Sequence, residues 1–436
     1  MLTQLLDALK SFDGAEYLIR ETKNSRRESY NIKKQSEMRR SVETTRLHLT
    51  LYRVFSEDGK KYRGSYSTEI HPGTSQGELR SKLEQAFHAA GFVKNEYFPL
   101  VEPSGNTGAA AETGSDGQKA VAGLEEALYS QDCFDGGHLS YSEFFVNRSR
   151  ERIVNSNGLD VSYASGSLFV ETAVHWKGER EKEIEILESY RSSLPLTGDT
   201  SAACKMLKDG IAQLFSVAQK KSLAGPTPKV SGINILLSGE CLVRVFDYYR
   251  FHSNAQMVYQ KFSTFEEGGT VQGEGDCDRI TLTLDPAMQG SGCSRPYDEH
   301  GLPLEKHVII KDGRLQKYWG NTRFASYLKI KPTGNIENIH VTGGSFSDVA
   351  LRKEPYLELV SFSDFQVNPV TGDFGSEIRL GFYFDGEKTV PVTGGSVSGN
   401  IAAVQNSFKM SVEERQYDNY RGPATVCLRG ASVSGV

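Results

Sequence analysis

The sequence contains no hydrophobic run long enough to cross a membrane. A membrane-spanning helix needs about 20 consecutive apolar residues, and no segment of the 436 residues approaches that length. The opening segment, MLTQLLDALKSFDGAEY, places leucines at helical spacing, but Asp7 interrupts them and no basic segment precedes them. This pattern predicts an amphipathic helix rather than a signal peptide. We therefore expect a cytoplasmic protein with no membrane partner.

Paired cysteines and blocks of like charge are also missing. Six cysteines, at positions 133, 204, 241, 277, 293 and 427, are scattered without a Cys-x-x-Cys motif, so we expect free and mostly buried thiols. The chain has 50 basic and 55 acidic residues and a net charge of −5, and its short basic clusters at Arg26–Arg27 and Arg39–Arg40 are typical of solvated strand or turn faces. No nucleic-acid partner is indicated.

Residues 1–102 show the pattern of a hairpin followed by a helix. Strands are predicted at Tyr17–Thr22, near Leu47–Val54, and at Lys61–Ile70 after the turn Glu57-Asp58-Gly59. Ser75 and Glu78 then form an S-x-x-E capping box that opens an amphipathic helix ending near Gly91.

Residues 120–222 repeat this pattern after a polar, glycine-rich segment at 103–119 that is typical of a linker or mobile loop. The turn Asn155-Ser156-Asn157-Gly158 and the strand Ser167–Trp176 predict a hairpin, and Ala202–Lys220 predicts a helix. Two prolines beside a glycine mark a second linker at 223–229.

Residues 230–436 change character. A buried strand at Ile233–Leu237 and a helix over Glu240–Tyr259 are followed by many short strands with Asp-Gly turns. The sequence therefore predicts an α+β protein, in which two hairpin-plus-helix units form an N-terminal α/β part and the C-terminal domain is β-rich and barrel-like or sandwich-like.

Several segments of this third region resemble the TldD/PmbA peptidase family, in the family's order. The most specific stretch lies between Ser361 and Asn400. The matching segments are LTLDP (Leu282–Pro286), SRPYDEHGLP (Ser294–Pro303), DGRLQKYW (Asp312–Trp319), NTRFAS (Asn321–Ser326), TGN (Thr333–Asn335), QVNPVTGDFG (Gln366–Gly375) and VSGN (Val397–Asn400). The N-terminal half resembles the family by its layout.

The resemblance implies a zinc peptidase lineage, but it also locates a degenerate site. TldD-like members carry an H-E-x-x-x-H helix and a later cysteine, whereas TldE/PmbA-like members lack these groups. By spacing, Asp247 stands for the first histidine, Tyr248 for the glutamate and His252 for the second histidine, and Ser361 falls where the cysteine is expected. A phenol ionises near pH ~10 and cannot replace a glutamate as general base. We expect no catalytic residue and no metal in this chain, and zinc in a TldD-like partner.

Other interpretations remain open at this stage. An autonomous metallopeptidase would use Asp247 and His252 together with Ser361 or a nearby aspartate. Cys277, Cys293, His300 and His307 could also be drawn as a zinc set, although their spacing matches no compact finger. Asp298 to His300 form an acidic turn for which capping is the expected role.

The family resemblance also implies partners. The leading hypothesis is a TldE/PmbA-like subunit that forms a dimer with a TldD-like chain or with itself and handles unfolded peptide. Two glycine pairs that permit close backbone approach are the predicted peptide-binding positions: Gly343, Gly344, Gly394 and Gly395. A peptide-binding scaffold without a protease link is the third hypothesis.

Overall fold

The computed structural model describes residues 1–103, 117–178 and 183–436. Most of the predicted linker at 103–119 lies outside the described residues. The helices are α1 (Leu2–Leu9), α2 (Gln76–Ala90), α3 (Gly117–Tyr129), α4 (Ser201–Ser222), α5 (Cys241–His252), α6 (Ala255–Tyr259), α7 (Thr322–Leu328), α8 (Asp348–Leu351), α9 (Ile401–Val404) and the 3-10 turn η2 (Gln405–Ser407).

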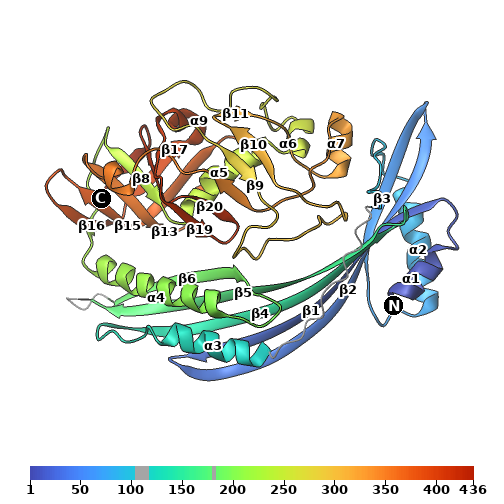
Figure 1. The fold of residues 1–436 in the computed structure, drawn as a ribbon, viewed down its shortest axis with the longest axis horizontal. Coiled ribbons are helices and arrows are strands. Elements are labelled where there is room, and N and C mark those ends of the chain that lie inside the picture. The colour runs from blue at the N-terminus through green and yellow to red at the C-terminus, as the bar shows by residue number, and fades with distance from the viewer. Residues whose placement is uncertain (104–116, 179–182) are drawn as a thin grey trace.

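A long, curved antiparallel sheet dominates the N-terminal half (Figure 1). Its order is β3-β2-β1-β4-β5-β6, so the two predicted hairpin-plus-helix units join edge to edge through the pair β1 and β4. The strands are β1 (Ala15–Ile32), β2 (Gln35–Glu57), β3 (Lys60–Ile70), β4 (Gly137–Asn155), β5 (Asp160–Lys177) and β6 (Glu183–Ser193).

Two pairs of helices pack on one face of this sheet. Helices α1 and α2 bury leucines against Ile19, Leu47 and Leu49, whereas α3 and α4 cover Phe144 and Val170 nearer the other end. Both sets of sheet residues point to the same face, because alternate residues of a strand share a face and the β1–β4 register aligns them. The predicted capping box of α2 is present, with Ser75 and Glu78 in reciprocal hydrogen bonds.

The opposite face of the sheet meets the third region of the chain. Leu18, Tyr52 and Ile153 form a small apolar cluster there with Tyr297, and Tyr327 packs beside it. The contact fixes one end of the sheet against the C-terminal part.

The C-terminal part contains two further sheets, of order β11-β10-β9-β12-β20-β19 and β18-β21-β8-β13-β15-β16-β7. The strands are β7 (Gly225–Pro226), β8 (Asn234–Ser238), β9 (Leu282–Leu284), β10 (His307–Lys311), β11 (Arg314–Leu315), β12 (Ile339–Val341), β13 (Tyr356–Phe362), β14 (Gln366–Val367), β15 (Asp373–Phe384), β16 (Thr389–Thr393), β17 (Ser396–Asn400), β18 (Lys409–Met410), β19 (Glu414–Tyr417), β20 (Tyr420–Pro423), β21 (Thr425–Leu428) and β22 (Ser432–Ser434). Strands β14, β17 and β22 extend the second of these sheets. The predicted α+β class is confirmed.

One large hydrophobic core lies between these sheets and α5. The two Asp-Gly turns lie where the sequence predicts them: Asp312 and Gly313, both at positive φ, join β10 to β11, and Asp385-Gly386 joins β15 to β16. The predicted linker at 223–229 contains β7, which pairs with β16.

The helix predicted over Glu240–Tyr259 is wrong as a single element. The structure ends α5 at His252 and begins α6 at Ala255. Asn254 is extended, and its side chain accepts a hydrogen bond from the backbone N–H of Gln256, which caps α6. Trp319 completes the break, because its N–H donates to the Ser253 carbonyl and its own carbonyl accepts from Ala255.

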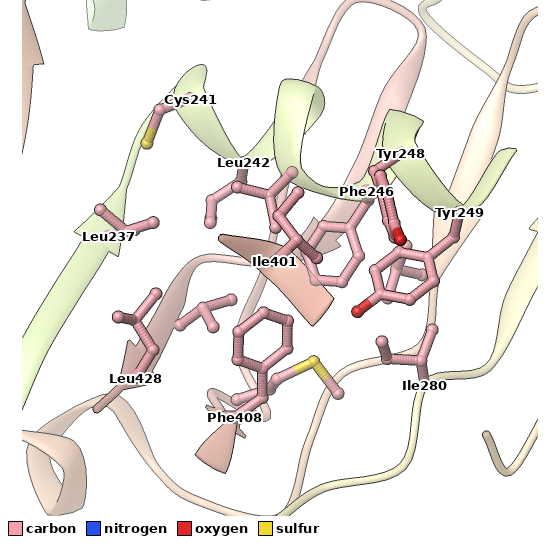
Figure 2. Packing of buried hydrophobic residues seen from close by; sticks show 14 of the residues in the cluster. Leu237, Cys241, Leu242, Phe246, Tyr248, Tyr249, Ile280, Ile401, Phe408 and Leu428 are labelled. Carbon is pink, nitrogen blue, oxygen red and sulfur yellow. The ribbon is translucent and has the colours of Figure 1, made fainter. Parts of the chain in front are cut away.

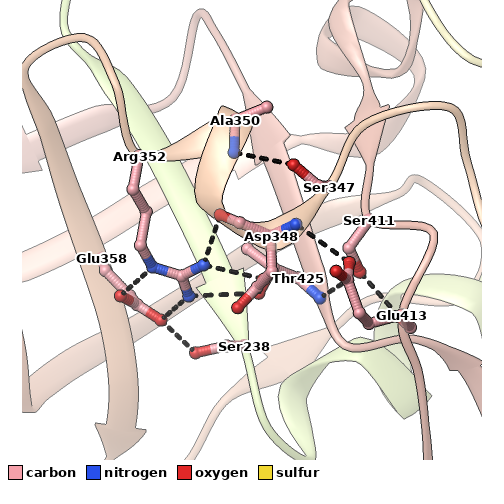
Figure 3. A network of polar contacts seen from close by, with 9 residues as sticks. All are labelled: Ser238, Ser347, Asp348, Ala350, Arg352, Glu358, Ser411, Glu413 and Thr425. Atoms are coloured by element: carbon pink, nitrogen blue, oxygen red, sulfur yellow. Dashed lines mark hydrogen bonds and ion pairs between the residues drawn. The ribbon is translucent and has the colours of Figure 1, made fainter.

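A polar network fixes the short helix α8 to the second C-terminal sheet (Figure 3). The Arg352 guanidinium donates to both carboxylate oxygens of Glu358, at 3.0 and 2.6 Å, and to the Thr425 hydroxyl. Glu358 also accepts from Ser238. Because Glu358 is nearly buried, these bonds replace the water that its charge would lose.

No helix in the described part of the chain is both long enough and apolar enough to span a bilayer. All six cysteines are free, but only Cys241 and Cys427 are buried and Cys133 is exposed, so the expectation of mostly buried thiols is wrong.

Candidate functional site

Helix α5 carries the positions that correspond to the zinc motif, and it is packed as a core element. Phe246 and Tyr249 are fully buried, and Figure 2 shows their rings directed into the apolar core near Ile280 and Phe408. The Tyr249 hydroxyl donates to Gln405 at 2.8 Å, which satisfies its one buried polar group.

Asp247 is held at the side of this helix by an ion pair. Its carboxylate lies 2.5 Å from Nε of Arg250, and its side chain is 35% exposed. The Arg250 guanidinium lies over the Trp319 ring, and the Trp319 indole donates to the Arg250 carbonyl. Asp247 therefore already has a cationic partner.

Tyr248 and His252 pack on each other one helical turn apart. Their ring centroids are 4.5 Å apart, and Phe265 lies 5.0 Å from His252. Burial raises the pKa of the Tyr248 phenol, so it stays protonated near neutral pH. These two side chains form part of an aromatic cluster.

His252 is the least satisfied polar group of the region. It is 5% exposed, and neither ring nitrogen has a hydrogen-bond partner. Burial lowers the pKa of this imidazole, and the nearby backbone of Val370 and Pro369 only partly opposes that effect. His252 is therefore neutral at pH 7.

The signature segment QVNPVTGDFG covers these rings. It forms the turn between β14 and β15, where Asn368 accepts hydrogen bonds from the N–H groups of Val370 and Thr371. Gly372 has φ +79°, and a Cβ there would stand 3.1 Å from the Tyr248 ring. The segment that suggested the family thus lies against the degenerate helix.

The donor set does not fit a catalytic zinc ion. Such a site needs about three protein ligands and an open position for water. Asp247 is paired with Arg250, Tyr248 remains protonated, and Ser361 lies on β13 as a neutral hydroxyl. Among the described residues, no three histidine, cysteine, aspartate or glutamate side chains are grouped so that they could hold a metal.

The Cys277, Cys293, His300 and His307 set is included in that finding, so the structure does not bring it together. Burial and nearby acidic groups raise the pKa of the Cys293 thiol to about 12. The capping role expected for the acidic turn is confirmed for Asp298, whose carboxylate accepts from the N–H groups of His300 and Leu302 at 2.9 Å.

The four glycines predicted to contact peptide are already close to this chain's own backbone. A Cβ at Gly343 would stand 2.9 Å from the Val412 carbonyl, and one at Gly344 would collide with Met410. Gly394 and Gly395 both have positive φ, and Gly395 lies against Ser434. Peptide contact at these glycines stays a prediction.

Sequence reasoning did not single out one group of charged residues. Lys23, Arg27, Arg148 and Arg150 line one hollow on the N-terminal sheet. The signal was present as alternation, since K-x-S-x-R at 23–27 and R-x-R at 148–150 each direct their side chains to one face of a strand.

Comparison with solved structures shows that the fold occurs in other proteins. The chain has the fold of a Thermotoga maritima protein described as a modulator of a DNA gyrase, with a TM-score of 0.76, 16% identity and full coverage of both chains. It has the same fold as TldE from Thermococcus kodakarensis, with a TM-score of 0.74, 14% identity and 99% coverage of each chain.

Sequence comparisons assign the C-terminal part of the chain to a family. Residues 231–435 match the PmbA/TldA metallopeptidase C-terminal domain. An uncharacterized Methanocaldococcus jannaschii protein is 25% identical over 57% of this chain and 59% of its own length. Metalloprotease PmbA of Escherichia coli O157:H7 is 31% identical over 28% of this chain and 29% of its own length. The aligned regions thus span less than two thirds of these relatives. Residues 231–435 therefore form a C-terminal domain of the PmbA/TldA metallopeptidase type, as the motifs in this region predict.

Proposed function

We propose that this chain is a TldE/PmbA-like, non-catalytic subunit of a cytoplasmic zinc metallopeptidase assembly that processes unfolded peptides. The observation that carries the proposal is the packing of Tyr248 and His252 under the QVNPVTGDFG turn. A water that attacks a peptide bond needs a metal or a base beside an open site, and an aromatic cluster occupies that position here.

Exposed strand edges support a role in handling extended peptide. Strands β3 and β6 end the N-terminal sheet, so each has one edge without a neighbouring strand in that sheet. Residues 95–97 already pair with β3 at Lys61–Arg63, so a peptide could add to β3 only beyond that stretch. An extended peptide can add to such an edge through main-chain hydrogen bonds, which gives affinity with little dependence on sequence.

The test uses this chain with a TldD-like homologue that carries an intact H-E-x-x-x-H helix. Each protein is purified alone and after co-expression, and zinc content and cleavage of an unfolded peptide are measured. We expect no zinc and no cleavage with this chain alone, and co-purification with higher or redirected cleavage in the pair. Failure to associate, with unchanged cleavage by the homologue, would contradict the proposal.

An autonomous metallopeptidase is the second candidate, because both nitrogens of His252 lack hydrogen-bond partners and could ligate a metal after rearrangement. Stoichiometric zinc in the isolated chain, together with cleavage that a chelator abolishes and that His252→Leu removes, would favour it. A peptide-binding scaffold would instead bind peptide and leave the homologue's cleavage unchanged. Crosslinks from bound peptide should fall within residues 230–436 if the four glycines contribute.

A further inference from the structure

Among the described residues, no helix covers the helix-bearing face of the N-terminal sheet between its two helix pairs. Ile19 packs with α1 and α2, and Val146 packs with α3 and α4. Between these contacts lies a hollow of about 560 Å³. Its lining consists of Lys23, Asn24, Ser25, Arg27, Glu43, Thr44, Thr45, Val146, Arg148 and Arg150.

Strand register brings the cations of this hollow together. Lys23 on β1 lies directly opposite Arg150 on β4, and Ser25 lies opposite Arg148. Directly opposite Cβ atoms are about 4.5–5.5 Å apart, and alternate residues of one strand are about 6.6–6.8 Å apart. Lys23, Arg148 and Arg150 thus occupy neighbouring positions, and Arg27 follows two residues beyond Ser25.

These cations have little compensating charge. Lys23 and Arg27 reach carboxylates of Glu21 and Glu43 only at 3.7 and 3.8 Å. Among the described residues, no carboxylate lies within 4.0 Å of Arg148 or Arg150. Arg148 donates to the Leu196 carbonyl at 3.1 Å, which leaves its charge uncompensated. Like charges that face each other across strands repel and destabilise the sheet.

The chemistry of the lining defines the ligand class. Arginine presents a planar fork of N–H donors that matches phosphate oxygens, and lysine adds a point charge. Ser25 and Thr45 add hydroxyl groups. The volume is in the range of small-molecule sites, about 300–1,000 Å³. We propose that this hollow binds a small organic polyanion that carries phosphate groups.

This site shares no residue with α5 and is independent of the proposed peptidase role. The test is isothermal titration of the full chain with inorganic tripolyphosphate at low salt, with citrate and sulfate as comparison anions. We expect saturable binding at one site, weakened by added salt, and a rise in Tm with tripolyphosphate. The double variant Arg148→Gln/Arg150→Gln should bind about tenfold more weakly or worse.

A matched control removes the same charge from the other face of the sheet. Arg20 and Arg46 lie on β1 and β2, and the register directs both away from the hollow. Arg20→Gln/Arg46→Gln should therefore bind like the wild type. If the Arg148/Arg150 variant does not fold, Lys23→Gln replaces it, because that side chain is 57% exposed. Its affinity should fall about threefold.

Three results would overturn the proposal. The first is no binding of tripolyphosphate by the wild type. The second is an equal loss of affinity in the Arg20/Arg46 control, which would indicate attraction by overall charge alone. The third is binding of citrate as tightly as tripolyphosphate, which would refute the assignment to phosphate.

Discussion

Strands β1 and β2 of the N-terminal sheet are 18 and 23 residues long, whereas β10 and β13 of the C-terminal part have 5 and 7 residues. The long strands are stabilised by separate small apolar clusters under each helix pair. The short strands surround one continuous core that includes α5. The two regions therefore differ in how their stability is distributed.

The difference extends to polar groups. In the C-terminal region, the charged and aromatic side chains predicted to align with the zinc motif are paired or buried, as Asp247 and Tyr248 show. In the N-terminal sheet, arginines such as Arg150 stand exposed beside a hollow. Polar side chains are thus satisfied within the core of one region, whereas the other region presents weakly compensated cations at its surface. Paired substitutions can test this comparison.

Truncation of an aromatic ring should give the largest difference in lost stability between the two regions. Phe246 is fully buried and stacks on Tyr420 with centroids 5.8 Å apart, so Phe246→Ala should destabilise the C-terminal region by about 3–5 kcal/mol. Phe145→Ala in the N-terminal sheet removes a half-buried ring and should lower stability by about 1 kcal/mol. Urea unfolding, with hydrogen exchange to assign each transition, measures both. Equal losses would contradict the comparison.

Removal of a guanidinium should have the next largest effect. Arg352→Met leaves Glu358, whose side chain is 11% exposed, without its cation. We expect a loss of about 2–3 kcal/mol, below the range for a fully buried pair. Arg152→Met breaks a bidentate pair with Asp160 whose side chains are 43% and 45% exposed, and should lose less than about 1 kcal/mol.

The double variant Arg352→Met/Glu358→Met is the control for the buried pair. It removes the stranded carboxylate as well as the guanidinium, and it should recover much of the lost stability. If it is as unstable as Arg352→Met alone, packing rather than the unpaired charge is responsible.

Glycine replacement tests the packing of the QVNPVTGDFG turn against helix α5. Gly372→Ala forces a Cβ at φ +79° to within 3.1 Å of the Tyr248 ring, and should cost about 2 kcal/mol. Gly14→Ala has a similar φ of +70° but no atom within 4 Å, so about 1 kcal/mol is expected from backbone strain alone. Thermal unfolding compares them, and an equal effect would show that contact with Tyr248 is unimportant.

Local signals in the sequence predicted much of the fold. The Ser75–Glu78 box, the Asn155–Gly158 turn and the Asp-Gly turns act through neighbouring residues, and all are present. The assignment of Asp247, Tyr248 and His252 as degenerate zinc-motif positions came from the family resemblance and stays a prediction, and the packing of Tyr248 on His252 is compatible with it.

Longer-range features could not be predicted. Strand β1 continues from Thr22 to Ile32 through polar residues on both faces, so no apolar alternation marks it. The β1–β4 pairing joins residues more than a hundred positions apart, and only its register brings Lys23 beside Arg150. The end of α5 depends on Trp319, which is distant in the sequence.

The smallest expected effect concerns pH. Burial lowers the folded-state pKa of His252. The imidazole therefore binds a proton more readily in the unfolded chain, where its pKa is about 6.5. The stabilising contribution of the neutral ring is therefore complete above about pH 6.5 and is lost as pH falls toward the folded-state pKa. His252→Leu removes this term, and its unfolding free energy should fall less steeply with acidification than that of the wild type.

His48 on β2 provides the matched comparison, because burial and Arg20 also lower its pKa although its side chain lies on the exposed sheet. Across the same range of pH, the stability of His48→Leu should diverge from that of the wild type less than the stability of His252→Leu does. The reason is that solvent can accommodate the charge on a surface ring. If wild type and His252→Leu lose stability equally on acidification, the folded protein accommodates the protonated ring, and the turn over α5 does not exclude water from His252.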